Sequence, residues 1–269
     1  MSRLLDTFNQ PAKKILNVYC TAGYPKLDST LEVMKSLQDN GANIIELGMP
    51  YSDPLADGPV IQQSGSIALA NGMTIAKLFE QLKDFRNPLF PQDAAQGDGG
   101  GISIPVILMG YMNPVLQYGF EKFCADAAVV GIDGLILPDL PEYEFETEYG
   151  AIIKKYGLDF IFLVTPETSE ERIKKLDSLS TGFLYAVSSS STTGSDIKTA
   201  NPEEYLLKLR NLKLKNPVLV GFGISNKQSF DAVCQLADGG IIGSAYIKAL
   251  ENSMDVNAAT KSFLSSILG

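Results

Sequence analysis

A single unit repeats along this chain: a short apolar segment, a polar loop and an amphipathic segment with helical spacing. Eight apolar segments have the length of a strand, and most are apolar at nearly every position, as strands covered on both faces are. Strict alternation of strands and helices favours a (β/α)8 barrel over a doubly wound sheet, which would need a Gly-x-Gly-x-x-Gly fingerprint before an early helix. The predicted strands are Leu16–Cys20, Ile44–Gly48, Pro105–Met109, Gly134–Leu137, Phe160–Val164, Phe183–Val187, Val218–Phe222 and Gly240–Gly243.

The chain is long for one domain, but α/β barrels routinely reach this size. We expect residues 1–269 to form a single TIM-barrel domain with extra N-terminal and C-terminal helices. Hydrophobic residues make up 45% of the chain, which is enough for a large core. Capping patterns predict helix starts at Ser29–Glu32, Thr168–Glu171, Ser225–Gln228 and Asn201–Pro202.

Residues 87–103 interrupt this regularity just before the third predicted strand. The stretch from Arg86 to Ser103 contains two prolines and the run Gly-Asp-Gly-Gly-Gly. It enters the strand from its N-terminal side, which is the face of a barrel that serves stability rather than chemistry. We therefore expect an irregular insert without a functional role.

The composition of the chain limits the reactions it can catalyse and the cellular compartment in which we expect it to work. The formal net charge is −9 and Lys and Arg cluster in pairs at most, so we expect no nucleic-acid partner. The chain has no histidine, which excludes His-based triads and zinc sites with His ligands. Its three cysteines are scattered and are interpreted as reduced and half-buried. Asp6 interrupts any signal-peptide pattern and no apolar run approaches ~20 residues, so we expect a cytoplasmic protein that does not span a membrane.

An acidic residue, Glu46, stands near the C-terminal end of the second predicted strand. It shares a strand face with Ile44, where a carboxylate is costly unless it has a partner or a function. A proline-rich loop with Asp53 and Asp57 follows at once, and in a barrel chemistry gathers where strands end. The two aspartates are also compatible with turn formation before Pro54 and Gly58. Two loop carboxylates alone make a poor cation site, so we expect no metal.

Three later loops stand at the same predicted face. The small residues 188–195 form either a lid or a flexible linker, and their position favours a lid. Gly221–Ser225 and Ile242–Ala245 follow the seventh and eighth strands, where glycines and a helix start commonly hold a phosphate. Tight turns are the alternative explanation for the glycines. No lysine ends a strand, which argues against a Schiff base and leaves acid–base chemistry by Glu46 and a loop aspartate.

The segment Glu46–Gln62 closely resembles the signature of the tryptophan synthase α subunit family. Five further segments resemble its first, third, fourth, sixth and seventh loops: Tyr19–Pro25, Gly110–Pro114, Pro138–Pro141, Thr192–Gly194 and Gly221–Ile224. The resemblance implies a TIM barrel that cleaves indole-3-glycerol phosphate to indole and glyceraldehyde 3-phosphate without a cofactor of its own. It also implies an α2β2 assembly with a β subunit, whose pyridoxal phosphate converts the indole to tryptophan.

By position, Glu46 and Asp57 match the two catalytic carboxylates of the family. The rigid loop around Asp53 and Pro54 is interpreted as a docking surface for the β subunit, because its three prolines pre-organise a projecting segment. Ser189 and Ser191 stand where many members carry Arg and Gly, so an Arg-dependent closure of the lid is in question. The resemblance assigns lid and phosphate contacts to Thr193, Gly194, Gly223, Gly243 and Ser244, and pocket positions to Tyr19, Tyr111, Tyr185 and Phe222.

Two other functions fit parts of the sequence. A non-catalytic barrel that binds a phosphate ligand and activates a partner needs the glycine loops alone, whereas the presence of both Glu46 and Asp57 favours a lyase. A sugar-phosphate isomerase also uses such loops, but it gives no reason for the long Pro/Asp segment. Indole release with and without a β subunit distinguishes the lyase from the activator.

Overall fold

The computed structural model describes residues 2–10, 14–88, 100–188, 201–251 and 253–269. Its strands are all parallel and follow the order β5-β4-β3-β2-β1-β9-β8-β7-β6. Their bounds are β1 (Ile15–Thr21), β2 (Ile44–Gly48), β3 (Val106–Met109), β4 (Gly134–Ile136), β5 (Asp159–Phe160), β6 (Leu163–Val164), β7 (Leu184–Ala186), β8 (Val218–Val220) and β9 (Gly239–Ile242).

The two edge strands of this order, β5 and β6, are pieces of one extended segment. Ile161 N donates to Leu135 O on one side at 3.1 Å, and Tyr185 N donates to Phe162 O on the other at 3.0 Å. The segment therefore joins both edges and closes the sheet into the predicted eight-stranded barrel. Each predicted strand coincides with an observed one to within two residues, because strands covered on both faces leave a clear apolar signal.

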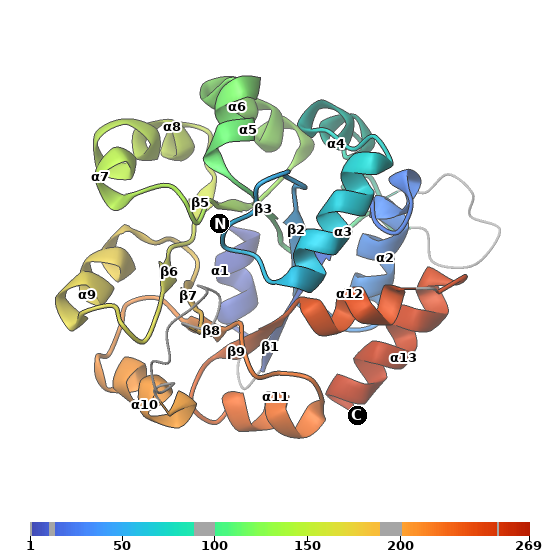
Figure 1. The fold of residues 1–269 in the computed structure, drawn as a ribbon. Coiled ribbons are helices and arrows are strands. Elements are labelled where there is room, and N and C mark those ends of the chain that lie inside the picture. Colours follow the sequence, from blue (N-terminus) through green and yellow to red (C-terminus); the bar gives the residue numbers. More distant parts are fainter. Residues whose placement is uncertain (1, 11–13, 89–99, 189–200, 252) are drawn as a thin grey trace.

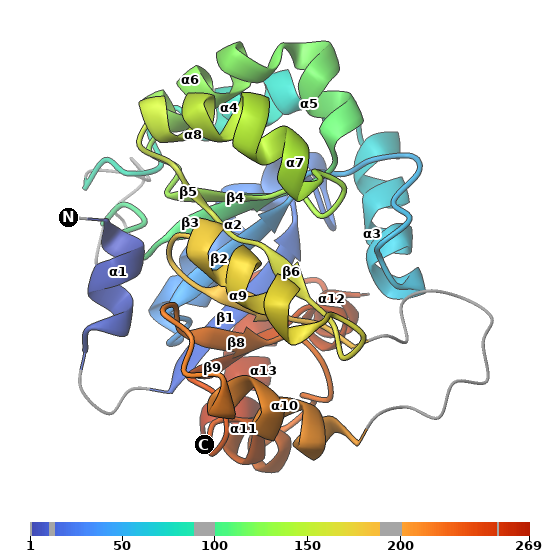
Figure 2. The ribbon, with the colours of Figure 1, turned by 90° about the vertical axis from the view of Figure 1, so that its left-hand side faces the viewer.

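Helices surround the strands, as Figures 1 and 2 show. Two lie outside the repeating unit, as expected: the first helix packs at the barrel's N-terminal end, and the last packs on the second. The helices are α1 (Arg3–Phe8), η1 (Leu27–Ser29), α2 (Thr30–Asp39), α3 (Pro59–Ala70), α4 (Ile75–Gln81), α5 (Met112–Tyr118), α6 (Phe120–Val130), α7 (Glu142–Glu144), η2 (Phe145–Tyr149), α8 (Gly150–Lys155), α9 (Glu170–Leu179), α10 (Pro202–Asn211), α11 (Lys227–Val233), α12 (Ser244–Leu250) and α13 (Val256–Leu268).

The helix starts follow the predicted caps only in part. Asn201 caps α10 as predicted, and its side chain accepts a hydrogen bond from Glu203 N at 3.2 Å. The caps of α9 and α11 are Ser169 and Asn226, each one residue after the predicted position. Ser29 directly precedes α2, as predicted, but the expected capping box is absent: a 3-10 turn ends at Ser29, which has helical backbone angles and makes no side-chain cap.

The barrel interior is closed at its N-terminal end. Leu4 of α1 is fully buried there and belongs to an interior cluster with Ile15 and Phe183. Farther up the barrel, isoleucines from neighbouring strands fill the cross-section, as the layered interiors of such barrels require. Any chemistry must therefore take place at the opposite, C-terminal end of the strands.

Arg86, directly before the insert, is a half-buried structural residue. Its guanidinium donates to the carbonyl oxygens of Gly131, Ile102 and Ile104 at 2.6–3.0 Å. It also forms an ion pair of 2.6 Å with the buried Asp133. These bonds anchor both ends of the insert to the barrel. Residues 89–99 of the predicted insert 87–103 lie outside the described part of the chain.

The three cysteines are free, but the expectation that all are half-buried was wrong. Cys20 and Cys124 are fully buried in the outer core, and only Cys234 is half-buried. Cys20 faces outward from β1 because strand residues alternate between the two sides of the barrel wall. Among the described residues, no helix is long and apolar enough to cross a membrane.

Candidate active site

Glu46 lies in β2 with its carboxyl group inside the barrel and only 1% of the residue exposed. Asn17 Nδ2 donates a hydrogen bond to Glu46 Oε2 at 2.9 Å. Burial, opposed by this hydrogen bond and reinforced by the charge of Asp57, raises the pKa of Glu46 to about 8. The carboxyl group is therefore protonated at neutral pH and needs little free energy to give up its proton, as an acid–base catalyst requires.

Asp57 lies in the loop between β2 and α3 and is only half-buried. Burial raises its pKa to about 6, and a hydrogen bond with the Tyr111 hydroxyl limits the rise. Asp57 is therefore ionised at pH 7, where Glu46 is protonated. Two neighbouring carboxyl groups with pKa values on either side of neutrality can serve as an acid and an anion in one reaction.

The same loop is braced against the rest of the barrel end. Ala56 N donates to the Tyr111 hydroxyl at 3.0 Å, and the rings of Tyr51 and Tyr111 lie 5.4 Å apart. Asp57 N donates to Pro54 O at 3.1 Å, which forms a turn. Asp53 is exposed, and its carboxylate accepts a hydrogen bond from its neighbour Ser52. Tyr111 thus holds the loop, and Asp57 with it, over the end of the barrel.

Tyr19 and Tyr185 project from β1 and β7, and each is 9% exposed. Each ring occupies space that is free only because a neighbouring residue is a glycine. A Cβ atom on Gly48 would lie 2.1 Å from the Tyr19 hydroxyl oxygen, and one on Gly221 would lie 2.2 Å from Tyr185 Cε2. These glycines make room for the two tyrosine rings beside Glu46.

A cavity of about 630 Å³ opens above these groups. On the β8–β9 side it is bordered by Gly243 and Ser244 at the start of α12, where Gly243 is the N-cap. On the β6–β7 side, Thr165, Arg172 and Ser188 complete the wall. The cavity is thus lined by two carboxyl groups and has glycine backbone at one edge.

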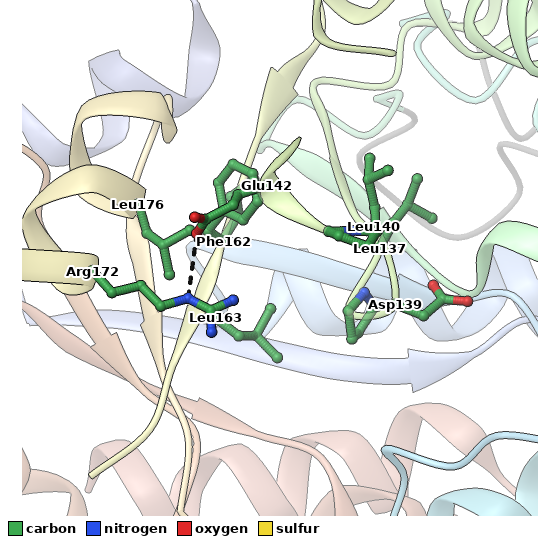
Figure 3. A pocket seen from close by; sticks show the side chains of 11 residues that line it. Leu137, Asp139, Leu140, Glu142, Phe162, Leu163, Arg172 and Leu176 are labelled. Atoms are coloured by element: carbon green, nitrogen blue, oxygen red, sulfur yellow. Dashed lines mark ion pairs between the residues drawn. The ribbon is translucent and has the colours of Figure 1, made fainter. Parts of the chain in front are cut away.

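A side cavity of about 270 Å³ adjoins the first and shares four lining residues with it: Pro138, Leu163, Arg172 and Leu176. It lies between the loop after β4 and helix α9, as Figure 3 shows. Arg172 and Glu142 form an ion pair of 3.2 Å across it. The side cavity widens the space at the barrel end toward the β4–α9 side.

The structure brings six of the predicted site residues together as cavity lining: Glu46, Asp57, Tyr19, Tyr185, Gly243 and Ser244. Tyr111, Phe222 and Gly223 are not among the described residues that line the cavity. Tyr111 acts through the Asp57 loop, and Phe222 stacks on Tyr205 of α10 with ring centroids 6.1 Å apart. Gly223 has a φ of +73°, a conformation that favours glycine. Thr193 and Gly194 lie outside the described residues.

The sequence analysis missed Asn17, Thr165 and Arg172. Asn17 is an isolated polar residue in an apolar strand, and that break in the strand pattern was a signal. Thr165 and Arg172 carried no comparable signal, because polar residues after a strand or in a first helical turn are common. In the described part of the chain, no group of three His, Cys, Asp or Glu residues could hold a metal ion.

The family model for the tryptophan synthase alpha chain matches residues 5–266. The chain belongs to this family. The tryptophan synthase alpha chain of Flavobacterium johnsoniae is 51% identical over 91% of this chain and 92% of its own length. That of Parabacteroides distasonis is 42% identical over 99% of both chains. Tryptophan synthase alpha chains act as indoleglycerol-phosphate lyases in tryptophan biosynthesis, and this is the activity of the chain.

Solved structures agree with this assignment. Tryptophan synthase subunit alpha from Legionella pneumophila superposes with a TM-score of 0.84 at 35% identity, covering 99% of this chain and 97% of that one. A chain of tryptophan synthase from M. tuberculosis gives a TM-score of 0.81 at 30% identity, covering 99% and 100%. In this family the alpha chain carries no cofactor, and the pyridoxal phosphate of tryptophan synthase is on the beta chain.

Proposed function

We propose that the cavity above Glu46 and Asp57 is the site where this tryptophan synthase alpha chain cleaves indole-3-glycerol phosphate. The observation that carries the proposal is the pair of carboxyl groups in one cavity with pKa values of about 8 and about 6. At neutral pH one is an acid and the other an anion, so the two can act at different atoms of one substrate.

Glu46 moves the proton. Its carboxyl group protonates the indole carbon that carries the glycerol chain, and the resulting carboxylate removes the proton from the adjacent hydroxyl group. The carbon–carbon bond then breaks, its electron pair restores the aromatic indole, and the hydroxyl carbon becomes the aldehyde of glyceraldehyde 3-phosphate. A raised pKa suits this double role, because the group must give and take a proton within one turnover.

Asp57 stabilises charge. Its carboxylate accepts a hydrogen bond from the indole N–H and faces the positive charge that develops on the protonated ring. The bond from Tyr111 favours the ionised form of Asp57 and limits its pKa to about 6. On the lid, Thr193 remains a candidate for orienting Asp57.

The phosphate group binds at the β8–β9 edge of the cavity. Gly243 and Ser244 offer backbone N–H groups at the start of α12, where the helix dipole favours an anion. Gly223 in the neighbouring loop and Gly194 of the lid complete the proposed contacts. Tyr19, Tyr185 and Phe222 are the proposed neighbours of the indole ring and the glycerol chain.

Replacing Glu46 with Gln tests the proposal. Gln is nearly isosteric but cannot exchange the proton, so cleavage should fall by roughly 10² to 10⁴-fold while substrate affinity changes little. Indole release from indole-3-glycerol phosphate is the assay, and Glu203→Gln, an exposed change on α10, is the control. A variant that keeps more than about a tenth of the activity contradicts the role of Glu46.

We further propose that the chain works in the cytoplasm in an α2β2 assembly with a β subunit that carries pyridoxal phosphate. Asp53 and Pro54 form the proposed docking loop. Its residue Leu55 is 86% exposed, while the next residue, Ala56, is held by its hydrogen bond to the Tyr111 hydroxyl, so a partner would find an apolar and pre-organised surface. The related M. tuberculosis structure is of tryptophan synthase.

Contact at this loop would hold Asp57 in place and couple assembly to catalysis. Replacing Asp53 or Pro54 with Ala should reduce the activation by a β subunit more than the low basal rate. The measurement is the rate of indole release at increasing β subunit concentration. Equal losses in both rates mean that the loop serves only the local active site.

A further inference from the structure

Asn17 is a buried polar residue in an apolar part of the barrel. It is fully buried in the middle of β1, on the same strand face as Ile15 and Tyr19. Its partners in register are Ile44 on β2 and Ile241 on β9. Aliphatic side chains would pack well at this point, so the amide needs an explanation other than packing.

The hydrogen bonds of Asn17 point to that explanation. Its Nδ2 donates to Glu46 Oε2 at 2.9 Å, and both groups are buried. Its Oδ1 has no hydrogen-bond partner within the described part of the chain. A buried amide with one unsatisfied atom lowers stability. The residue is therefore poorly explained by stability and well explained by its contact with Glu46.

We infer that Asn17 is a positioning residue for the acid–base carboxyl group of Glu46, an inference that rests on the role proposed for Glu46. The hydrogen bond occupies Oε2 and fixes the plane of the carboxyl group. Oε1 is thereby left for the substrate. Because proton transfer requires a donor within hydrogen-bond reach of the reacting atom, a fixed carboxyl plane sets the geometry of both transfers.

Asn17 also balances the electrostatics around Glu46. The other groups that interact with it are Tyr19 and Cys20 from β1, Asp57 from the loop after β2, and Tyr185 from β7. Burial and Asp57 raise the pKa of Glu46, whereas the bond from Asn17 lowers it. Without Asn17, the group would hold its proton too tightly to donate it readily.

The experiment uses the full chain with a β subunit. Asn17→Leu removes the donor and keeps the branched shape of the side chain at a somewhat larger volume, whereas Asn17→Ser loses the direct contact and introduces no bulk. The control is Ile107→Val, which trims the β3 residue in register with Glu46 and leaves the hydrogen bond intact. For each variant, kcat and KM are measured against pH, and the Glu46 carboxyl is titrated by carbon-13 NMR, its signal assigned by its absence in Glu46→Gln.

In both Asn17 variants, the Glu46 titration and the alkaline limb of kcat should move to higher pH. We expect kcat near neutral pH to fall about tenfold with KM within about twofold, a loss typical of a hydrogen bond to a charged group, here the carboxylate that forms when Glu46 donates its proton. Ile107→Val should change neither the Glu46 titration nor the dependence of kcat on pH. Testing two Asn17 variants keeps the result interpretable if the bulkier one does not fold.

An unmoved Glu46 titration in the folded Asn17 variants overturns the inference. So does a moved titration with an unchanged kcat, because positioning would then have no effect on the reaction. Failure of the proposed function looks different: Glu46→Gln would keep its activity, while the NMR titration would still report the hydrogen bond. The two ideas are thus tested separately.

Discussion

Glu46→Gln should make the protein more stable, by an amount that grows with pH. Burial raises the pKa of Glu46 from its ordinary value of 4.5 to about 8. Between these values, the folded chain keeps a proton that the unfolded chain has lost, so folding becomes less favourable as the pH rises. The stability is fully present below pH 4.5 and is lost by about pH 8.

The magnitude follows from the same two values. Each pH unit between them costs about 1.4 kcal/mol, which gives about 3 kcal/mol at pH 7 and about 5 kcal/mol above pH 8. The amide of the Glu46→Gln variant would carry no charge at any pH and would avoid this cost. The carboxyl group of Glu46, the proposed acid–base catalyst, therefore lowers the stability of the fold at neutral and alkaline pH, and its uncharged analogue Gln removes this cost.

Urea unfolding of both proteins at several values between about pH 5 and pH 9 measures the effect. The two free energies of unfolding should be close at the acidic end, diverge by about 1.4 kcal/mol per pH unit, and run parallel above about pH 8. Glu203→Gln removes an exposed carboxylate and controls for the change in net charge. A gap of constant size would refute the reasoning, as would a variant that becomes the less stable protein at alkaline pH.

Three further perturbations, the last with a matched control variant, test other parts of the structure. Gly243→Val should raise KM more than about tenfold, and more than replacing any lysine does, because it crowds the proposed phosphate edge; an unchanged KM in steady-state assays would remove Gly243 from that edge. Gly221→Ala places a Cβ atom 2.2 Å from the Tyr185 ring, so kcat/KM should fall at least about tenfold, and a wild-type value would show that the ring is dispensable. Arg86→Met should lower the free energy of unfolding by about 3 kcal/mol, because it leaves the buried Asp133 without the largely buried partner of its ion pair. Arg3→Met, at the exposed partner of the same carboxylate, should cost less than about 1 kcal/mol, and equal costs in urea titrations would contradict the difference in burial.

The fold was predictable because both faces of each strand are covered. The strand around Ile44 and Glu46 was located to the residue, since its apolar run has clear ends. Helix starts were less certain, because adjacent polar residues such as Thr168 and Ser169 can each serve as the cap. Which one does so depends on the backbone angles of the preceding turn, and the spacing of residue types does not encode these.

The residues of the candidate site were predictable only where a residue type is unusual for its local sequence pattern. Glu46 was found because an acid at the end of an apolar strand is unusual. Its partner Asn17 stands 29 positions away along the chain, so nothing in the local pattern joins the two. The same holds for Arg86 and Asp133, which are 47 positions apart. Pairings of this kind depend on strand register and barrel closure, which emerge only from the complete fold.

Barrel closure also imposes an order of events on synthesis. One edge of β1 pairs with β2 soon after both are made, but its other edge pairs with β9, about 220 residues later. At 5–20 residues per second, the N–H and C=O groups on that edge wait roughly 10 to 45 seconds for their partners. An unpaired strand edge is a template for association with other chains. The second edge of β1 pairs with β9 at Gly239, and the two backbones are so close there that a Cβ atom on Gly239 would lie 2.1 Å from Ile15 O. A larger residue at position 239 should therefore reduce the yield of soluble chain more than it reduces the rate of indole release by the chains that do fold.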